Sequence, residues 1–175
     1  LAVVGHDFGS PVAAYCALLR PDVFQSVVMM SAPFAGPPPA TEFPVGTVAV
    51  CDEQTAQSTP TIHASLAALE RPRKHYQWYY STPEANDDMC HCSQGVHDFL
   101  RAYFHYKSAD WAGNRPFHLN AWSAGELAKL PTYYVMDLDL GMAETVAPYM
   151  PAADAIADCM WLSETELEVY SSEYG

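Results

Sequence analysis

Residues 3–9 read Val-Val-Gly-His-Asp-Phe-Gly, and this segment restricts the fold more than any other part of the chain. The apolar residues before Gly5 suit a strand, and Ser10 and Pro11 open an apolar stretch that suits a helix. A strand that passes into a helix through Gly-x-Asp-x-Gly makes a tight, strained turn, which requires small residues at both glycine positions. The sequence therefore predicts a strand–turn–helix unit that presents Asp7 at its turn.

This pattern resembles the nucleophile elbow of the α/β-hydrolases, with Asp7 at the position where lipases and esterases carry serine. A carboxylate nucleophile suits displacement at a saturated carbon, as in an epoxide or an alkyl halide, and it forms an alkyl ester with the enzyme. The N-terminal end of the following helix favours the charged carboxylate. We expect the backbone N–H of Phe8 to donate to the oxyanion that forms when water attacks this ester.

A closer resemblance runs through residues 4–13, 20–24 and 31–34, which are similar to the core of soluble epoxide hydrolases of the fungal and bacterial type. The resemblance implies that Asp7 attacks the less hindered epoxide carbon while two lid tyrosines hydrogen-bond the ring oxygen. A His–Asp pair then activates water. The His-Tyr-Gln-Trp-Tyr-Tyr segment at 75–80 resembles the lid segment that carries the first tyrosine, and this assigns that role to Tyr76.

The predicted fold class is α/β, as a fragment of the α/β-hydrolase fold. Residues 1–36 are expected to form a partial core of strand, nucleophile elbow, helix and strand, and residues 37–175 a mainly helical lid that is incomplete at its C-terminus. The resemblance places the triad Asp and His, the second lid tyrosine and the second oxyanion donor outside this sequence. We therefore interpret the chain as an internal fragment of a longer enzyme, and we expect these 175 residues to be inactive alone.

Several further elements are predicted from local patterns. We expect the helix over Val12–Leu19 to be well buried and the strand over Ser26–Ser31 to be parallel and covered on both faces. The proline cluster at 36–39 marks the exit from the core. Helices are expected over 61–69, 93–107 and 151–157 and after the capping-box serines at 123 and 163, with either an extended stretch or a helix lead-in at 132–136.

Three groups of residues invite a functional interpretation but favour a structural one. His6 is expected to be a hydrogen-bonded core residue rather than the catalytic base. The Cys-His-Cys run at 90–92 cannot close a tetrahedral zinc site, because its three residues are consecutive and no second pair follows at a suitable spacing. Asp137 and Asp139 resemble a carboxylate pair, yet a turn with a helix N-cap is the preferred interpretation. No metal or organic cofactor is implied.

Composition limits the partners. The net charge of −13 argues against nucleic acid and anionic membranes, and no apolar run reaches the length of about 18 residues that a membrane span needs. Five scattered cysteines are typical of reduced thiols in a cytoplasmic protein, although targeting signals stay open.

The function these observations favour is an epoxide hydrolase whose substrates are a small apolar epoxide and water. Phe8, Phe34, Gln77 and Trp78 are the predicted substrate-binding residues. One alternative is a haloalkane or haloacid dehalogenase, which also uses an elbow Asp but often cradles the halide with a Trp at the position where this chain has Phe8. The other alternative is a non-catalytic binding protein on the same fold. The particular epoxide and the oligomeric state stay undefined.

Overall fold

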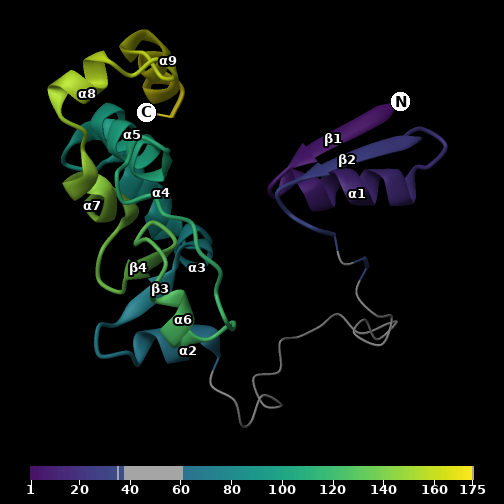
Figure 1. Ribbon diagram of the computed structural model, residues 1–175, viewed down its shortest axis with the longest axis horizontal. Coiled ribbons are helices and arrows are strands. Elements are labelled where there is room, and N and C mark those ends of the chain that lie inside the picture. Colours follow the sequence, from purple (N-terminus) through teal and green to yellow (C-terminus); the bar gives the residue numbers. More distant parts are fainter. Residues whose placement is uncertain (35, 38–60, 175) are drawn as a thin grey trace. The chain divides into compact units, whose positions relative to one another are not determined.

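The computed structural model describes residues 1–34, 36–37 and 61–174, and it shows a mixed α/β chain with two small sheets (Figure 1). The chain divides into two compact units, Leu1–Thr55 and Ala56–Gly175, and each is described here on its own. The predicted change from core to lid after residue 36 stays a prediction. Pro38 and Pro39 of the proline cluster, like Cys51, lie outside the described residues.

The first unit has the predicted order of strand, helix and strand. β1 (Ala2–His6) leads into α1 (Gly9–Leu19), and β2 (Ser26–Met30) follows. The two strands pair in parallel, from Ala2 opposite Ser26 to His6 opposite Met30. α1 ends directly before Arg20, as expected from the proline that follows. The parallel pairing of the two apolar runs is therefore confirmed.

The predicted burial of this unit is wrong. In α1 only Ser10, Ala13 and Ala14 are buried, whereas Val12 and Leu19 are 62% and 72% exposed. All five residues of β2 are exposed as well. The physical reason is that one helix on a two-stranded sheet covers a single stripe of each element. The remaining apolar surface has no second layer among the described residues of this unit.

The second unit is mainly helical, and it contains the helices predicted near 61–69, 93–107, 124, 151–157 and 164. Its elements are α2 (Ile62–Ala67), β3 (Arg73–His75), α3 (Tyr76–Tyr80), α4 (Pro83–Cys90), α5 (Gly95–Lys107), α6 (Ala124–Leu127), β4 (Val135–Asp137), α7 (Met142–Val146), η2 (Ala147–Tyr149), α8 (Ala153–Ala157) and α9 (Glu164–Tyr174). Of the two alternatives for 132–136, the extended one is correct for Val135 and Met136 alone, because β4 starts at Val135.

The helix starts depend on side-chain caps. The Ser163 hydroxyl accepts from the Glu166 backbone N–H (3.3 Å), and the Glu166 carboxylate accepts from the Ser163 N–H (2.8 Å), which completes a capping box before α9. Before α6 only half of the box forms. Ser123 accepts from the Glu126 N–H, but the Glu126 carboxylate accepts from Asn120 instead.

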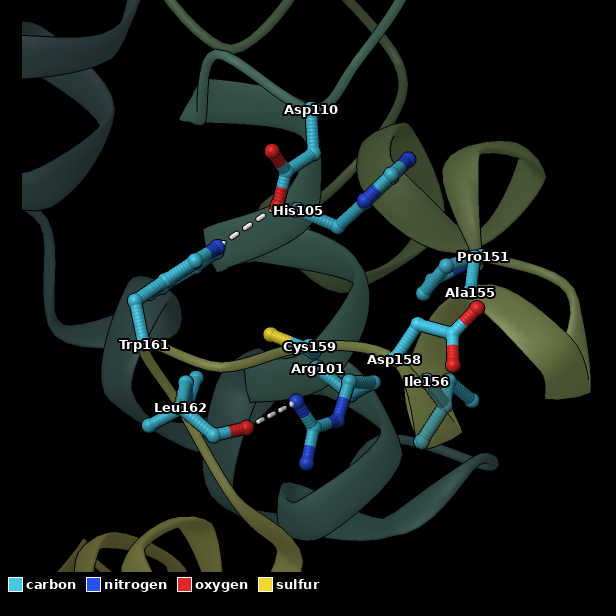
Figure 2. Close-up of a pocket in the computed structure, with 10 residues that line it drawn as sticks. All are labelled: Arg101, His105, Asp110, Pro151, Ala155, Ile156, Asp158, Cys159, Trp161 and Leu162. Carbon is cyan, nitrogen blue, oxygen red and sulfur yellow. Dashed lines mark hydrogen bonds between the residues drawn. The ribbon is translucent and has the colours of Figure 1, made fainter.

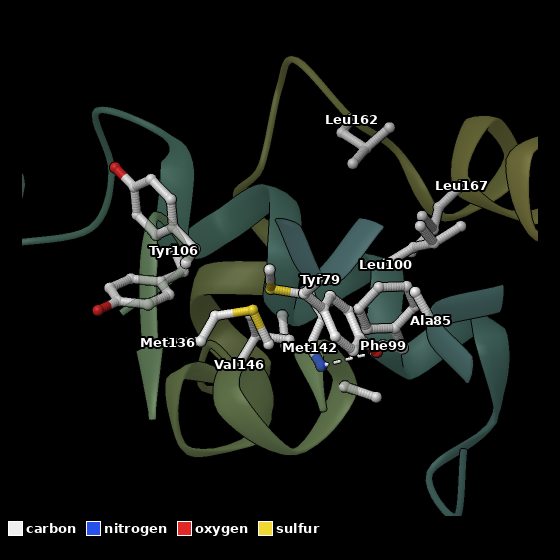
Figure 3. Close-up of a cluster of buried hydrophobic side chains, with 13 residues drawn as sticks. Tyr79, Ala85, Phe99, Leu100, Tyr106, Met136, Met142, Val146, Leu162 and Leu167 are labelled. Carbon is white, nitrogen blue, oxygen red and sulfur yellow. Dashed lines mark hydrogen bonds between the residues drawn. The ribbon is translucent and has the colours of Figure 1, made fainter. Parts of the chain in front are cut away.

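The main core of the second unit lies around α5 (Figure 3). Phe99, Leu100 and Ala102 are buried there against Met142 and other residues of α7, and Leu167 of α9 is fully buried in the same cluster. Tyr106, at the end of α5, stacks on the Tyr149 ring with centroids 3.5 Å apart. A second, smaller cluster of Leu66, Leu127 and Val135 joins α2, α6 and β4.

β3 and β4 pair antiparallel, from Arg73 opposite Asp137 to His75 opposite Val135. Arg71 donates to both carboxylate oxygens of Asp137, each at 2.6 Å, and this pairing holds the pKa of Asp137 below its usual range. The predicted turn after Asp137 is present, but the predicted N-cap is wrong. The next helix, α7, starts at Met142 and has Gly141 at its N-cap, so neither Asp137 nor Asp139 occupies that position.

Candidate functional site

Asp7 sits between β1 and α1 in a strained backbone conformation. Its φ is +54°, in the left-handed region that non-glycine residues seldom adopt. The backbone N–H of Asp7 donates to the Met30 carbonyl at the end of β2 (3.0 Å), and the Asp7 carbonyl accepts from Ser10 N–H (2.9 Å). The side chain is exposed. The turn therefore presents an exposed carboxylate at the carboxyl end of two parallel strands, where α/β proteins place their ligand sites.

Gly5 is required by the close approach of β1 to the start of α1. A Cβ at this position would lie 1.9 Å from the Gly9 carbonyl oxygen, which is far inside van der Waals contact. The expectation that Gly9 must also be small is wrong. A Cβ on Gly9 meets nothing within 4 Å, since this residue already belongs to α1 and its Cβ direction points away from β1. One glycine, not two, closes the elbow.

Ser10 contributes to the elbow in a way that the sequence analysis missed. Its buried hydroxyl lies 3.0 Å from the Gly5 carbonyl oxygen and 2.7 Å from the Met30 carbonyl oxygen, and it accepts from the Met30 N–H at 2.9 Å. A single side chain thereby joins β1, α1 and β2 beneath Asp7. The available signal was a serine directly after the Gly-x-Asp-x-Gly turn, where an aliphatic residue would also pack.

The other candidate residues of the first unit are Phe8, Phe34 and His6. Phe8 is the N-cap residue of α1 and is 64% exposed, and its backbone N–H donates to no described residue. Phe34 is partly buried and packs edge-on against Tyr15 of α1, with ring centroids 4.9 Å apart. His6 is hydrogen-bonded as expected, through Nε2 to the Ser31 hydroxyl at 2.8 Å, but it is exposed rather than in the core. His6 is the last residue of β1, at the carboxyl end of the sheet.

Tyr76, Gln77 and Trp78 are consecutive residues of α3 in the second unit. His75 caps this helix, and Tyr76 N–H donates to the Tyr134 carbonyl at 2.9 Å. The half-buried Tyr76 ring contacts the rings of Tyr80 and Tyr134 in edge-on geometry, with centroids 5.7 Å and 5.4 Å away. Gln77 is exposed, and its side-chain amide donates to the Tyr76 hydroxyl at 3.4 Å. Trp78 is 46% exposed. The tyrosine is thus held by aromatic neighbours on two sides.

Burial disfavours the charged forms of the side chains around Tyr76. It raises the pKa of Tyr79 to about 12 and, together with the neighbouring Tyr103 hydroxyl, it also raises the pKa of Tyr80. Burial lowers the pKa of His75, with a smaller contribution from His63. At neutral pH the two neighbouring tyrosines are therefore neutral phenols that can donate hydrogen bonds, and His75 is a neutral imidazole.

The Cys-His-Cys run lies at the end of α4. His91 Nδ1 pairs with Asp87 at 2.9 Å, and Cys90 and Cys92 are free thiols, as are Cys16 and Cys159. Within residues 1–34, 36–37 and 61–174, no three His, Cys, Asp or Glu side chains are grouped so that they could hold a metal ion. No described helix is long and apolar enough to cross a membrane.

A cavity of about 270 Å³ lies between α5 and the segment that carries α8 and Trp161 (Figure 2). Arg101 is buried on one wall, where it donates to the Leu162 carbonyl (2.8 Å) and to Glu164 (2.7 Å). On another wall, the Trp161 indole N–H donates to Asp110 at 2.6 Å. Arg101 Nε has no partner among the described residues, yet protein atoms seal it from solvent, so it does not face a ligand. These contacts assign the cavity a structural role in joining α5 to the C-terminal helices.

No protein-family model, curated protein or solved structure matches this chain. The chemistry of the elbow and of the tyrosine segment is therefore the basis for a functional assignment.

Proposed function

We propose that this chain carries the nucleophile of an epoxide hydrolase of the α/β-hydrolase type. The observation that carries the proposal is Asp7, an exposed carboxylate at positive φ on a strand-to-helix turn, with Gly5 in contact with Gly9 beneath it. A strained, exposed nucleophile on such a turn is the defining device of that fold. The parallel pairing of β1 and β2 and the edge position of Asp7 also support the proposal.

In the proposed reaction an Asp7 carboxylate oxygen attacks one epoxide carbon and forms a C–O bond. The ring C–O bond breaks, and its oxygen takes a proton, which the resemblance assigns to the Tyr76 hydroxyl; this leaves a hydroxyalkyl ester on Asp7 and a tyrosinate at Tyr76. Water then attacks the ester carbonyl, and the Phe8 N–H donates to the oxyanion. One proton of this water goes to the departing diol oxygen and the other returns to Tyr76, so that the Asp7 carboxylate is regenerated. The resemblance assigns the activation of this water to a His–Asp pair that it places outside residues 1–175. Phe34, Gln77 and Trp78 are our candidates for the substrate pocket.

A single-turnover experiment with styrene oxide tests the nucleophile. Mass spectrometry should find the adduct on the peptide that contains Asp7, and Asp7→Asn should abolish it unless the amide slowly hydrolyses back to Asp. The matched control is Asp22→Asn, which removes an exposed carboxylate near the other end of α1, where it pairs with Arg20, and should leave labelling intact. An adduct on any other residue would reject the proposal, and alkylation by a chloroalkane but not by epoxides would favour the dehalogenase.

The same experiment addresses catalytic turnover. We expect the 175-residue chain to accumulate the ester without releasing diol repeatedly, because an ester without a positioned base is long-lived. His6 is the one histidine in the sequence of the first unit, and its Nε2 is engaged by Ser31. Diol release well above one equivalent per chain would instead place a working base among the seven histidines of this sequence.

A further inference from the structure

The second unit contains another cavity, of about 470 Å³, between α3, α4, α5 and α9. This volume lies in the range of small-molecule sites, roughly 300–1,000 Å³. Its walls are mostly apolar and are formed by Ala85, Met89, Val96, Phe99, Leu100 and Phe104. No Asp, Glu, Lys, Arg or His belongs to its lining, in contrast to the cavity beside Arg101. The lining therefore favours a neutral, apolar occupant, because a charged one would lose hydration without gaining an ionic partner.

Polar side chains also line this cavity, namely Thr82, Asn86, Cys90 and the tyrosines Tyr80, Tyr103 and Tyr174. Tyr80 and Tyr103 both line it, and the Tyr80 hydroxyl donates to the Tyr103 oxygen over a long 3.4 Å. Lys107, one helical turn beyond Tyr103, donates to the same oxygen at 3.0 Å, and its ammonium lies 4.8 Å from the centre of the Tyr103 ring. The Tyr103 oxygen thus accepts two hydrogen bonds, one of them from a cation.

A phenol has one proton to donate and an oxygen that can accept. The Tyr103 oxygen accepts from Tyr80 and Lys107, and no described residue accepts the Tyr103 proton. Hydrogen bonds accepted by a hydroxyl polarise it and strengthen its donation, most of all when the donor is charged. Tyr103 is therefore prepared to donate to a ligand, and the apolar walls provide the surface for the rest of that ligand.

We propose that this cavity binds a neutral apolar molecule with one hydrogen-bond-accepting oxygen, such as a ketone, ester or ether, and that the Tyr103 hydroxyl donates to that oxygen. The proposal does not depend on Asp7, which belongs to the first unit, so Asp7→Asn should leave this binding unchanged.

The test uses two probes of matched shape, benzophenone and diphenylmethane, which differ in the carbonyl oxygen. Ligand-observed NMR titration of the 175-residue chain should give an affinity about three- to tenfold higher for benzophenone, the scale of one hydrogen bond. Tyr103→Phe keeps the ring and should remove this difference while leaving diphenylmethane binding unchanged. Tyr15→Phe, which removes a hydroxyl from α1, is the matched control and should preserve the difference.

Cys90 gives a second readout, because its side chain lines this cavity whereas Cys159 lines the other one and Cys16 lies in α1. Benzophenone should slow alkylation of Cys90 by N-ethylmaleimide, as followed by peptide mass spectrometry, and should leave Cys16 and Cys159 unaffected. Equal affinities for the two probes, or equal protection of all three thiols, would overturn the proposal. Because this measurement uses the unsubstituted chain, a comparison of Cys90 protection by benzophenone and by diphenylmethane decides the question even if Tyr103→Phe folds poorly.

Discussion

Substitution of Gly5 by alanine should damage the elbow far more than the same change at Gly9. At Gly5 the new Cβ falls 1.1 Å short of a tolerable 3.0 Å separation, and the obstructing atoms are the backbone carbonyl of Gly9, which no rotamer change can move. The start of α1 must therefore shift away from β1. We expect a loss of about 3 kcal/mol, the upper end of ordinary overpacking. At Gly9 the Cβ enters open space, and alanine should be neutral or stabilising by up to about 0.5 kcal/mol.

Hydrogen exchange measured by mass spectrometry can assign this effect to the first unit. In Gly5→Ala, the opening equilibrium of peptides from β1 and α1 should increase about a hundredfold, which corresponds to the free-energy loss given above. Peptides from α5 belong to the other unit and serve as the internal reference. The reasoning fails if Gly5→Ala leaves exchange in β1 unchanged, or if Gly9→Ala accelerates it equally.

Three further predictions concern single side chains. Tyr76→Phe should lower the rate of Asp7 alkylation by an epoxide by roughly one to a few powers of ten, and an unchanged rate in stopped-flow single turnover would remove Tyr76 from the mechanism. Asp137→Asn should cost about 1 kcal/mol in urea unfolding at pH 7. Arg71 lowers the pKa of Asp137 in the folded state. The stability difference between wild type and Asp137→Asn should therefore be largest above the pKa of Asp137 in the unfolded chain, and it should disappear as the pH falls through the pKa in the folded protein. A stability difference that stays constant from about pH 7 to about pH 2 would contradict this prediction. Tyr79→Phe should cost about 1–3 kcal/mol by the same assay, because the Met142 N–H loses its acceptor, and a neutral effect would show that water replaces the phenol.

The elbow was predictable from sequence because its signals are local. Gly5, Pro11 and two short apolar runs predicted β1, α1 and β2 with nearly correct ends, and parallel pairing follows from the intervening helix. The burial of these elements was not predictable, because hydrophobic residues show only that a partner surface is needed. The role of Ser10 was also missed, since a serine after a turn looks the same in the sequence whether its hydroxyl caps the following helix or joins two strands.

In the second unit, β3 and the cavity around Tyr103 were not predicted, because each is formed by residues that lie far apart in the sequence. β3 was not predicted, because three residues rich in charge have no strand pattern and its partner β4 lies more than sixty positions away. The cavity around Tyr103 is similarly assembled from four elements. Its one local clue was Lys107 four residues after Tyr103, a spacing that brings two side chains together on a helix but is common on exposed surfaces.

The β3–β4 pair also has a consequence for the order of folding. Sixty-two residues separate Arg73 from Val135, whose carbonyl accepts from its guanidinium. Closing a loop of that length costs about 4 kcal/mol in chain entropy beyond a constant term. The three residue pairs, the ion pairs of Asp137 with Arg71 and Arg73, and the Arg73–Val135 contact form only after this loop has closed. The aromatic contacts within α5 join much nearer residues, such as Phe99 and Tyr103. The contacts within α5 should therefore form early, and β3 and β4 should pair only after the rate-limiting barrier to folding has been crossed. Changes at Asp137 would then accelerate unfolding while leaving the folding rate almost untouched.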